Sequence, residues 1–302
     1  MRIALKVDVD TYRGTVEGVP RLVELFKRHG VGATFLFSLG PDHTGRAIRR
    51  VFRPGFMKKV SRTSVVEHYG IRTLLYGTVL PGPDIGKRCA DLLRSVKKAG
   101  FETGIHTWDH VRWQDYVATA DERWTKRELD AASSRYREIF GAPAKVHGAA
   151  GWQMNDAAYR YLRDAGFTYC SDSRGTHPYV PVLADGSDGV PQFPTTLPTL
   201  DEILGADGID ASNAAAYVMS VAGNRSDTGH VYTLHSELEG AKLMPVMEAL
   251  ITGWKAAGHE LVSLATLAAA TDIGTLPRHL ATMGTVPGRS GTLAVQGLKQ
   301  AG

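Results

Sequence analysis

Side chains of the kinds that bind metals and move protons recur along this chain at spacings that could bring them together. They are, in chain order, Asp8, Asp10, His106, His110, Asp172 and His235. Two histidines and one carboxylate hold a divalent cation while leaving coordination positions open for water and substrate. With a second carboxylate beside them, the set indicates metal-assisted hydrolysis.

Asp8 and Asp10 are separated by one residue at the end of an apolar alternating segment. Alternate residues of a strand face the same way, and two parallel carboxylates repel unless a cation or a proton separates them. One of them can bind a metal, and the other can take a proton from metal-bound water. His106 and His110 are four residues apart, which places both imidazoles on one face if the segment is a helical turn.

His235 follows the apolar segment 231–234 and is the candidate general acid. Amide hydrolysis must protonate a poor amine leaving group, and an imidazolium near neutral pH suits that task. Asp172 is the candidate partner that would keep this ring charged.

A recurring glycine marks where the helices end and the strands that position these residues begin. Five segments of helical character end in Gly and lead into short apolar segments, and Gly is preferred just after a helix because it adopts the left-handed conformation without steric cost. Strands are predicted near 3–9, 33–39, 102–106, 145–150, 167–172, 231–235 and 260–264. Alternating strands and helices predict an α/β fold, a deformed (β/α) barrel of about seven strands, with an open doubly wound sheet as the alternative. In such a barrel the active site forms at the carboxyl ends of the strands, where these residues lie.

The 302 residues fit one catalytic barrel over 1–272, with 41–85 as an insertion and 273–302 as a loosely ordered tail rich in Gly, Thr and Pro. Two cysteines without paired spacing favour a reducing compartment, and the N-terminus lacks a secretory signal pattern. The apolar segments are too short to span a bilayer.

The insertion contains a basic amphipathic stretch, Arg46 to Arg62, which has no acidic residue. Such a stretch with aromatic residues is typical of an element that lies on an anionic membrane surface. The residues expected to bind the membrane are Arg49, Arg50, Phe52, Phe56, Lys58 and Lys59. A solvated cap over the barrel and, as a weaker possibility, nucleic-acid binding are the alternatives; we expect no nucleic-acid partner.

The Asp-x-Asp after the first strand, the segment His-Thr-x-x-His and the late Leu-His together resemble the polysaccharide deacetylase superfamily (carbohydrate esterase family 4). The resemblance implies a deformed barrel and one divalent metal, with Zn, Mn, Co and Fe equally suited. It implies that Asp10, His106 and His110 are the ligands, Asp8 the base and His235 the acid.

Longer blocks, among them GIHTWDHVRWQ, PTTLPTLDE and TLHSELEG, resemble a deformylase subgroup over roughly 3–270. That resemblance implies removal of formate from an undecaprenyl-phosphate-linked formamido-arabinose during lipid A modification and polymyxin resistance. The expected location is peripheral, on the cytoplasmic face of the bacterial inner membrane. The alternatives are an N-deacetylase for another amino sugar or amide, a non-haem iron oxygenase, and a non-enzymatic sugar- or lipid-binding barrel.

One departure from the superfamily is the lack of an Arg-x-Pro segment, whose Arg tethers the catalytic base. The corresponding stretch is His147 to Trp152. Arg174 or Arg13 could replace that Arg, and we expect Arg13, Trp152 and Arg174 to bind substrate.

Overall fold

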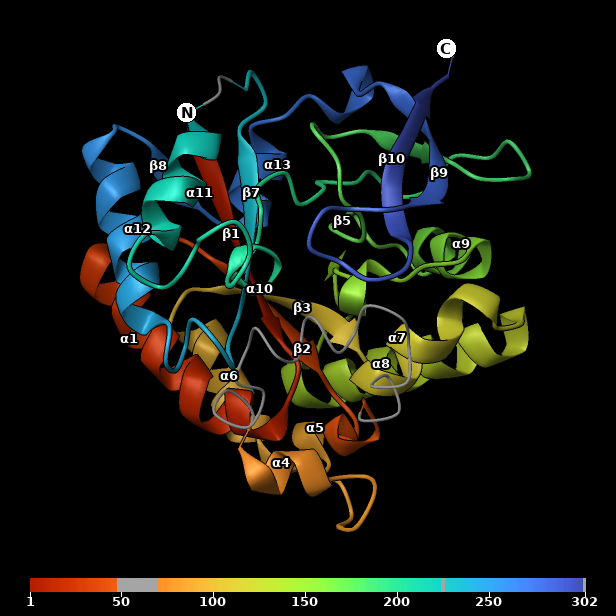
Figure 1. The fold of residues 1–302 in the computed structure, drawn as a ribbon. Coiled ribbons are helices and arrows are strands. Elements are labelled where there is room, and N and C mark those ends of the chain that lie inside the picture. The colour runs from red at the N-terminus through yellow and green to blue at the C-terminus, as the bar shows by residue number, and fades with distance from the viewer. Residues whose placement is uncertain (48–69, 224–225, 301–302) are drawn as a thin grey trace.

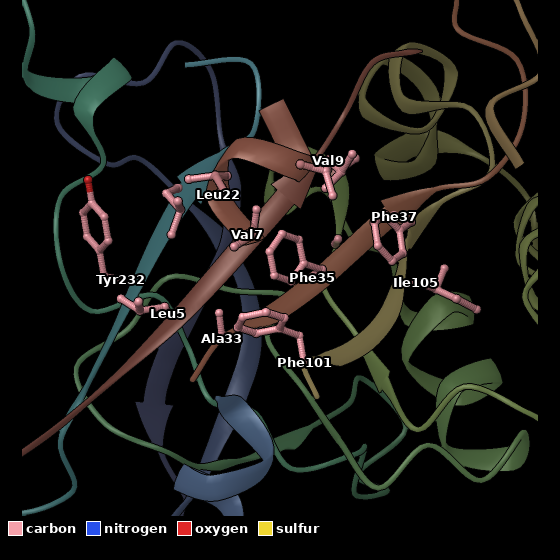
Figure 2. Close-up of a cluster of buried hydrophobic side chains, with 14 of the residues drawn as sticks. Leu5, Val7, Val9, Leu22, Ala33, Phe35, Phe37, Phe101, Ile105 and Tyr232 are labelled. Carbon is pink, nitrogen blue, oxygen red and sulfur yellow. The ribbon is translucent and has the colours of Figure 1, made fainter. Parts of the chain in front are cut away.

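Strand β1 (Arg2–Val9) is the longest described strand of the main sheet (Figure 1). Its odd-numbered residues Leu5, Val7 and Val9 join a buried apolar cluster with Phe35 and Leu22 (Figure 2). Because side chains alternate across a strand, Lys6 and Asp8 face the other side of the sheet. The apolar face of β1 therefore anchors the strand, and its polar face is available for chemistry.

The computed structural model describes residues 1–47, 70–223 and 226–300. The other strands of the main sheet are β2 (Thr34–Ser38), β3 (Glu102–Thr107), β4 (Val146–His147), β5 (Tyr169–Cys170), β7 (His230–His235) and β8 (Glu260–Val262). Their order is β5-β4-β3-β2-β1-β7, and β8 pairs with the start of β1. Every pairing in this sheet is parallel, so all seven predicted strands form and their carboxyl ends meet at one side.

Helices surround this sheet, with β1 inside the ring they form (Figure 1). They are α1 (Val19–His29), α4 (Ile71–Leu75), α5 (Ile85–Arg88), α6 (Ala90–Lys98), α7 (His110–Tyr116), α8 (Glu122–Phe140), α9 (Asp156–Asp164), α10 (Leu200–Ile203), α11 (Ala214–Ala222), α12 (Met244–Ala256) and α13 (Leu264–Ala269). Several end as the glycine pattern predicts. Gly30 after α1 and Gly141 after α8 both have positive φ, and both accept the left-handed conformation that ends a helix.

The gap between β5 and β7 is bridged by the extended segment 192–197. The backbone N–H of Phe193 donates to the carbonyl of Cys170, and that of Thr196 donates to the carbonyl of Val231. The main sheet thus curls into a deformed barrel, as predicted, instead of the open doubly wound sheet.

The prediction of a loosely ordered tail over 273–302 is wrong for the part that the structure describes. β9 (Arg278–Gly284) and β10 (Leu293–Lys299) form an antiparallel hairpin that pairs with β6 (Val180–Val182) in a second sheet. Leu293 and Ala294 are buried. Contacts with distant parts of the chain stabilise this segment. Such long-range contacts leave no periodic apolar pattern in the local sequence.

The described parts of the insertion are 41–47 and 70–85. A bridge between Pro41 and Asp84 brings its two ends together beside α4 and α5. All six predicted membrane-binding residues lie in 48–69, outside the described residues. Within the described parts of the chain, no helix has both the length and the apolar character needed to cross a bilayer.

Candidate metal centre and active site

The metal-ligand candidates meet at the carboxyl ends of β1 and β3. Asp8 is in β1, Asp10 follows it, His106 lies in β3 and His110 is the first residue of α7. His106 Nε2 is 3.2 Å from Asp10 Oδ1, and His110 Nε2 is 3.3 Å from Asp10 Oδ2. Ligand atoms of these three residues all lie within 4.8 Å of one another, so one ion could be held among them.

The helical-turn explanation for the His106–His110 spacing is wrong. His106 ends up on a strand and His110 on the following helix, whose N-terminus is capped by the Asp109 side chain accepting from the Arg112 N–H at 3.1 Å. The turn between the two elements brings the rings together, with their centroids 5.5 Å apart. The predicted juxtaposition is therefore present, produced by a strand–turn–helix.

The protonation pattern of the cluster fits a cation. His106 Nδ1 lies 2.6 Å from the Gly148 carbonyl oxygen, which can only accept, so this nitrogen carries the proton. In the neutral ring Nε2 then presents a lone pair to Asp10 Oδ1, a buried oxygen without a hydrogen-bond donor in the described structure. Two acceptors facing each other at this distance need a proton or a metal cation between them. A backbone carbonyl that orients a histidine through its other ring nitrogen is usual for a metal ligand.

Charge also favours the ionised form of Asp10. Burial alone would raise its pKa, but the nearby imidazoles of His110 and His106 outweigh burial and hold the pKa below its ordinary value. Asp10 is therefore a carboxylate ready to bind a metal ion.

Lys6 is the cation beside the proposed base, and sequence reasoning missed it. The Lys6 side chain is fully buried, its Nζ is 3.3 Å from Asp8 Oδ2, and it donates to the Ser171 carbonyl at 3.0 Å. The suggested substitutes for the missing Arg lie elsewhere: Arg13 pairs with Glu17, and Arg174 pairs with Glu202. A signal was available, because Lys6 precedes Asp8 by two residues and so shares its strand face.

Asp172 contacts His147 and not His235, its predicted partner. Its Oδ1 is 2.6 Å from His147 Nδ1, and its Oδ2 accepts from Gln192 Nε2 at 3.1 Å. All of these groups are fully buried, so Asp172 belongs to a hydrogen-bonded network of the barrel interior.

His235 ends β7 and pairs in register with Asp8 of β1, which places the acid and base candidates on adjacent strands. Its backbone N–H donates to Glu239 Oε2 at 2.9 Å. Burial would lower the pKa of His235, but the carboxylates of Asp201, then Asp10, outweigh burial and raise it. The protonated ring is thus favoured, as a general acid requires, and Asp201 contributes more to this than any other carboxylate.

Glu237 is a second residue that sequence reasoning missed. Its Oε1 accepts from the backbone N–H groups of Asp10 and Thr11, at 3.0 and 2.7 Å, and from the Thr11 hydroxyl at 2.8 Å. Gly14 must be glycine here, since an added Cβ would lie 2.0 Å from that oxygen. Burial raises the pKa of Glu237 to about 8. Glu237 therefore holds the loop that carries Asp10.

Trp152 is almost fully buried and lies under three cationic groups. Its ring centroid is 5.3 Å from Lys6 Nζ, 5.2 Å from the Arg174 guanidinium carbon and 4.5 Å from that of Arg289. Its φ of 52° is in the left-handed region, which is unusual for a bulky residue and is often found at functional sites. Trp152 links the base side of the site to the C-terminal hairpin; substrate contact by Arg13, Trp152 and Arg174 stays a prediction.

The family model described as polysaccharide deacetylase matches residues 2–170, more than half of the chain. This chain belongs to the polysaccharide deacetylase family. Among curated relatives, a Shewanella sediminis protein named "probable 4-deoxy-4-formamido-L-arabinose-phosphoundecaprenol deformylase" is 39% identical over 90% of this chain and 87% of its own length. A protein of the same name from Wigglesworthia glossinidia brevipalpis is 31% identical over 94% of this chain and 98% of its own length.

Solved structures of deacetylase relatives share the fold. A Mycobacterium smegmatis protein described as a polysaccharide deacetylase superposes with a TM-score of 0.61 at 17% identity, covering 94% of this chain and 95% of that one. A family 4 acetyl xylan esterase from Clostridium thermocellum, solved with a cobalt ion, gives 0.52 at 13% identity, covering 89% and 91%. The polysaccharide deacetylase family is metal-dependent, and its deacetylases and deformylases hydrolyse carbon–nitrogen bonds. The described residues of this chain include an Asp-His-His cluster that could hold the ion.

Proposed function

We propose that this protein removes formate from undecaprenyl-phosphate-linked 4-deoxy-4-formamido-L-arabinose, as the names of its curated relatives describe for them. The observation that carries this proposal is 39% identity extending over 90% of the chain to a relative so named. The cluster of Asp10, His106 and His110 beside a buried second carboxylate supports it, because amide hydrolysis needs both a cation and a base.

Asp10, His106 and His110 would hold one divalent ion, which when bound polarises the amide oxygen and lowers the pKa of a coordinated water. Asp8 accepts a proton from the attacking water while the water oxygen bonds to the formyl carbon. Lys6 holds the Asp8 carboxylate in place through Oδ2. His235 donates a ring proton to the sugar nitrogen as the carbon–nitrogen bond breaks, so that formate and a free amino sugar are the products.

The lipid-linked substrate implies that the enzyme works at a membrane surface, on the cytoplasmic face of the bacterial inner membrane. We propose that the basic amphipathic stretch 46–62 attaches it there through attraction to anionic lipids. Co-sedimentation with anionic liposomes at low salt tests this. A variant with Arg49, Arg50, Lys58 and Lys59 all changed to Glu should remain in the supernatant; equal sedimentation of both proteins would contradict the proposal.

The activity is tested by incubating metal-loaded enzyme with the formamido-arabinose lipid and with its acetamido analogue, and identifying the products by mass spectrometry. We expect formate and the amino sugar from the first substrate, with oxygen excluded. The Asp8→Asn variant, which keeps the ligand set, is the matched control. Turnover of the acetamido lipid alone would replace the proposed function with N-deacetylation.

A further inference from the structure

The segment that follows β2 lies between the two loops that carry the metal-ligand candidates. In the main sheet β2 pairs in parallel with β1 on one side and with β3 on the other. Asp10 follows β1, whereas His106 and His110 lie at the end of β3 and the start of α7. The backbone N–H of Gly40 donates to the Trp108 carbonyl at 2.8 Å, so this segment runs beside the turn after β3. The next residues along the chain can therefore contact both loops.

Asp42 contacts the loop after β1. Its side chain is buried, and its Oδ2 accepts from the backbone N–H of Tyr12 at 2.9 Å. Its Oδ1 accepts from the Thr44 N–H at 3.0 Å and from the Thr44 hydroxyl at 2.6 Å, which fixes the orientation of the carboxylate. Tyr12 is two residues beyond Asp10, whose own N–H donates to Glu237. Two carboxylates, one after β7 and one after β2, thus hold the backbone of this metal-ligand loop.

His43 contacts the turn between β3 and α7. Its Nδ1 lies 2.5 Å from Asp109 Oδ2, and because a carboxylate oxygen accepts, the ring nitrogen is the donor. Asp109 is fully buried and stands directly before His110 in the chain. Its other oxygen, Oδ1, caps α7 by accepting from the Arg112 N–H at 3.1 Å. His43 therefore orients the carboxylate that fixes the start of the helix where His110 lies.

The two ends of the insertion hold Asp42 and His43 in place. The Asp42 N–H donates to the Pro83 carbonyl at 2.9 Å. Gly82 packs so closely that an added Cβ would lie 2.0 Å from the Asp42 carbonyl oxygen. At Gly77, whose φ is 78°, an added Cβ would lie 2.7 Å from His43 Cδ2. These close contacts leave both residues little room to move.

We propose that Asp42 and His43 are positioning residues that set the spacing of the metal ligands. Asp42 acts through the backbone of Tyr12. His43 acts through the Asp109 carboxylate. This inference rests on the metal centre of the proposed function. A transition-metal site tolerates displacements of its ligand atoms of only about 0.2 Å. The ligands here belong to loops after β1 and β3, which β2 separates in the sheet, so a segment that binds both loops fixes their relative position.

The test measures the Co²⁺ dissociation constant of metal-stripped protein and the visible absorption of bound Co²⁺, which reports ligand geometry. His43→Leu removes the donor and should weaken Co²⁺ binding about 10–100-fold, the usual effect of losing a group that orients a ligand. His43→Asn should keep wild-type affinity and absorption, because its amide nitrogen is as many bonds from the backbone as Nδ1 is. His29→Leu is the matched control, since His29 pairs with Glu248 at 3.0 Å between α1 and α12, and it should bind as wild type does.

The other contact is tested separately. Asp42→Ala removes the acceptor for the Tyr12 N–H and should also weaken Co²⁺ binding about 10–100-fold. Thr44→Val is its control, since this change removes only the hydroxyl bonded to Oδ1 and should leave the affinity unchanged. If His43→Leu does not fold, His43→Gln takes its place, because its amide nitrogen is one bond farther from the backbone.

A purely structural role predicts a different result. The metal-free variants would then unfold at a lower temperature, but folded His43→Leu and Asp42→Ala would bind Co²⁺ with wild-type affinity, and that outcome would overturn the proposal. Neither readout uses enzymatic activity. Weakened binding in these variants, with no formate released by wild type, would keep this inference and reject the proposed deformylase function.

Discussion

Replacing Lys6 by Met tests whether this buried ammonium group holds the catalytic carboxylate. Met has nearly the same length and shape as Lys, so the change removes the charge with little change in packing. The variant leaves Asp8, which is 3% exposed, without its cation 3.3 Å away. The Ser171 carbonyl also loses the hydrogen bond that Lys6 donates.

The size of the effect can be worked out from the geometry. Two unit charges 3.3 Å apart attract by about 5 kcal/mol at an effective dielectric constant near 20. Removing one partner of a buried ion pair costs about 3–5 kcal/mol of folding free energy by measurement on other proteins. The two estimates agree, so we expect Lys6→Met to lower the free energy of unfolding by about 3–5 kcal/mol.

Turnover should fall as well, on the order of 10²-fold, because misplacing a catalytic group by about 1 Å has an effect of that size. Urea unfolding measures the first quantity, and formate release by the metal-loaded protein measures the second. Lys145→Met is the matched control, since this lysine is exposed and makes one hydrogen bond to the Gly166 carbonyl. A Lys6→Met protein with the stability and turnover of wild type would refute the assigned role of Lys6.

Four further changes have defined outcomes. His106→Ala should abolish metal binding at the catalytic cluster and activity together, which metal analysis and formate release would show. Asp8→Asn should keep the catalytic metal yet reduce turnover on the order of 10²–10⁴-fold, and near-normal turnover would contradict its role as base. Arg289→Met should destabilise the fold by about 3 kcal/mol in urea, because it removes the cation that Asp201 and Glu202 share, although Glu202 keeps its ion pair with Arg174. Burial raises the pKa of Glu128 from 4.5 to about 7, so its stabilising contribution is full below about pH 4.5 and is lost as pH rises through about 7. Glu128→Gln should therefore reduce the fall in the free energy of unfolding between about pH 4.5 and pH 7.

The residues of the metal cluster could be predicted from sequence because their signals are local. Asp8 and Asp10 share a strand face, and an apolar alternating segment marks that strand. His106 and His110 were matched by motif, although the prediction gave the wrong local structure to their spacing. The strands could be predicted because the apolar pattern of a strand and the glycine that ends the helix before it each depend only on neighbouring residues of the chain.

Tertiary structure alone decided which carboxylate lies near His235, and it alone gave the C-terminal segment an ordered structure. Asp172 was assigned to His235 because both end a strand, but barrel closure places Asp172 against His147 and brings Asp201 toward His235 instead. The sequence of the C-terminal segment has no local pattern that predicts its structure. Part of that structure depends on Arg289, which donates hydrogen bonds to carboxylates nearly 90 residues earlier in the chain. Contacts across such separations depend on how elements pack, and composition and periodicity record only what each element does by itself.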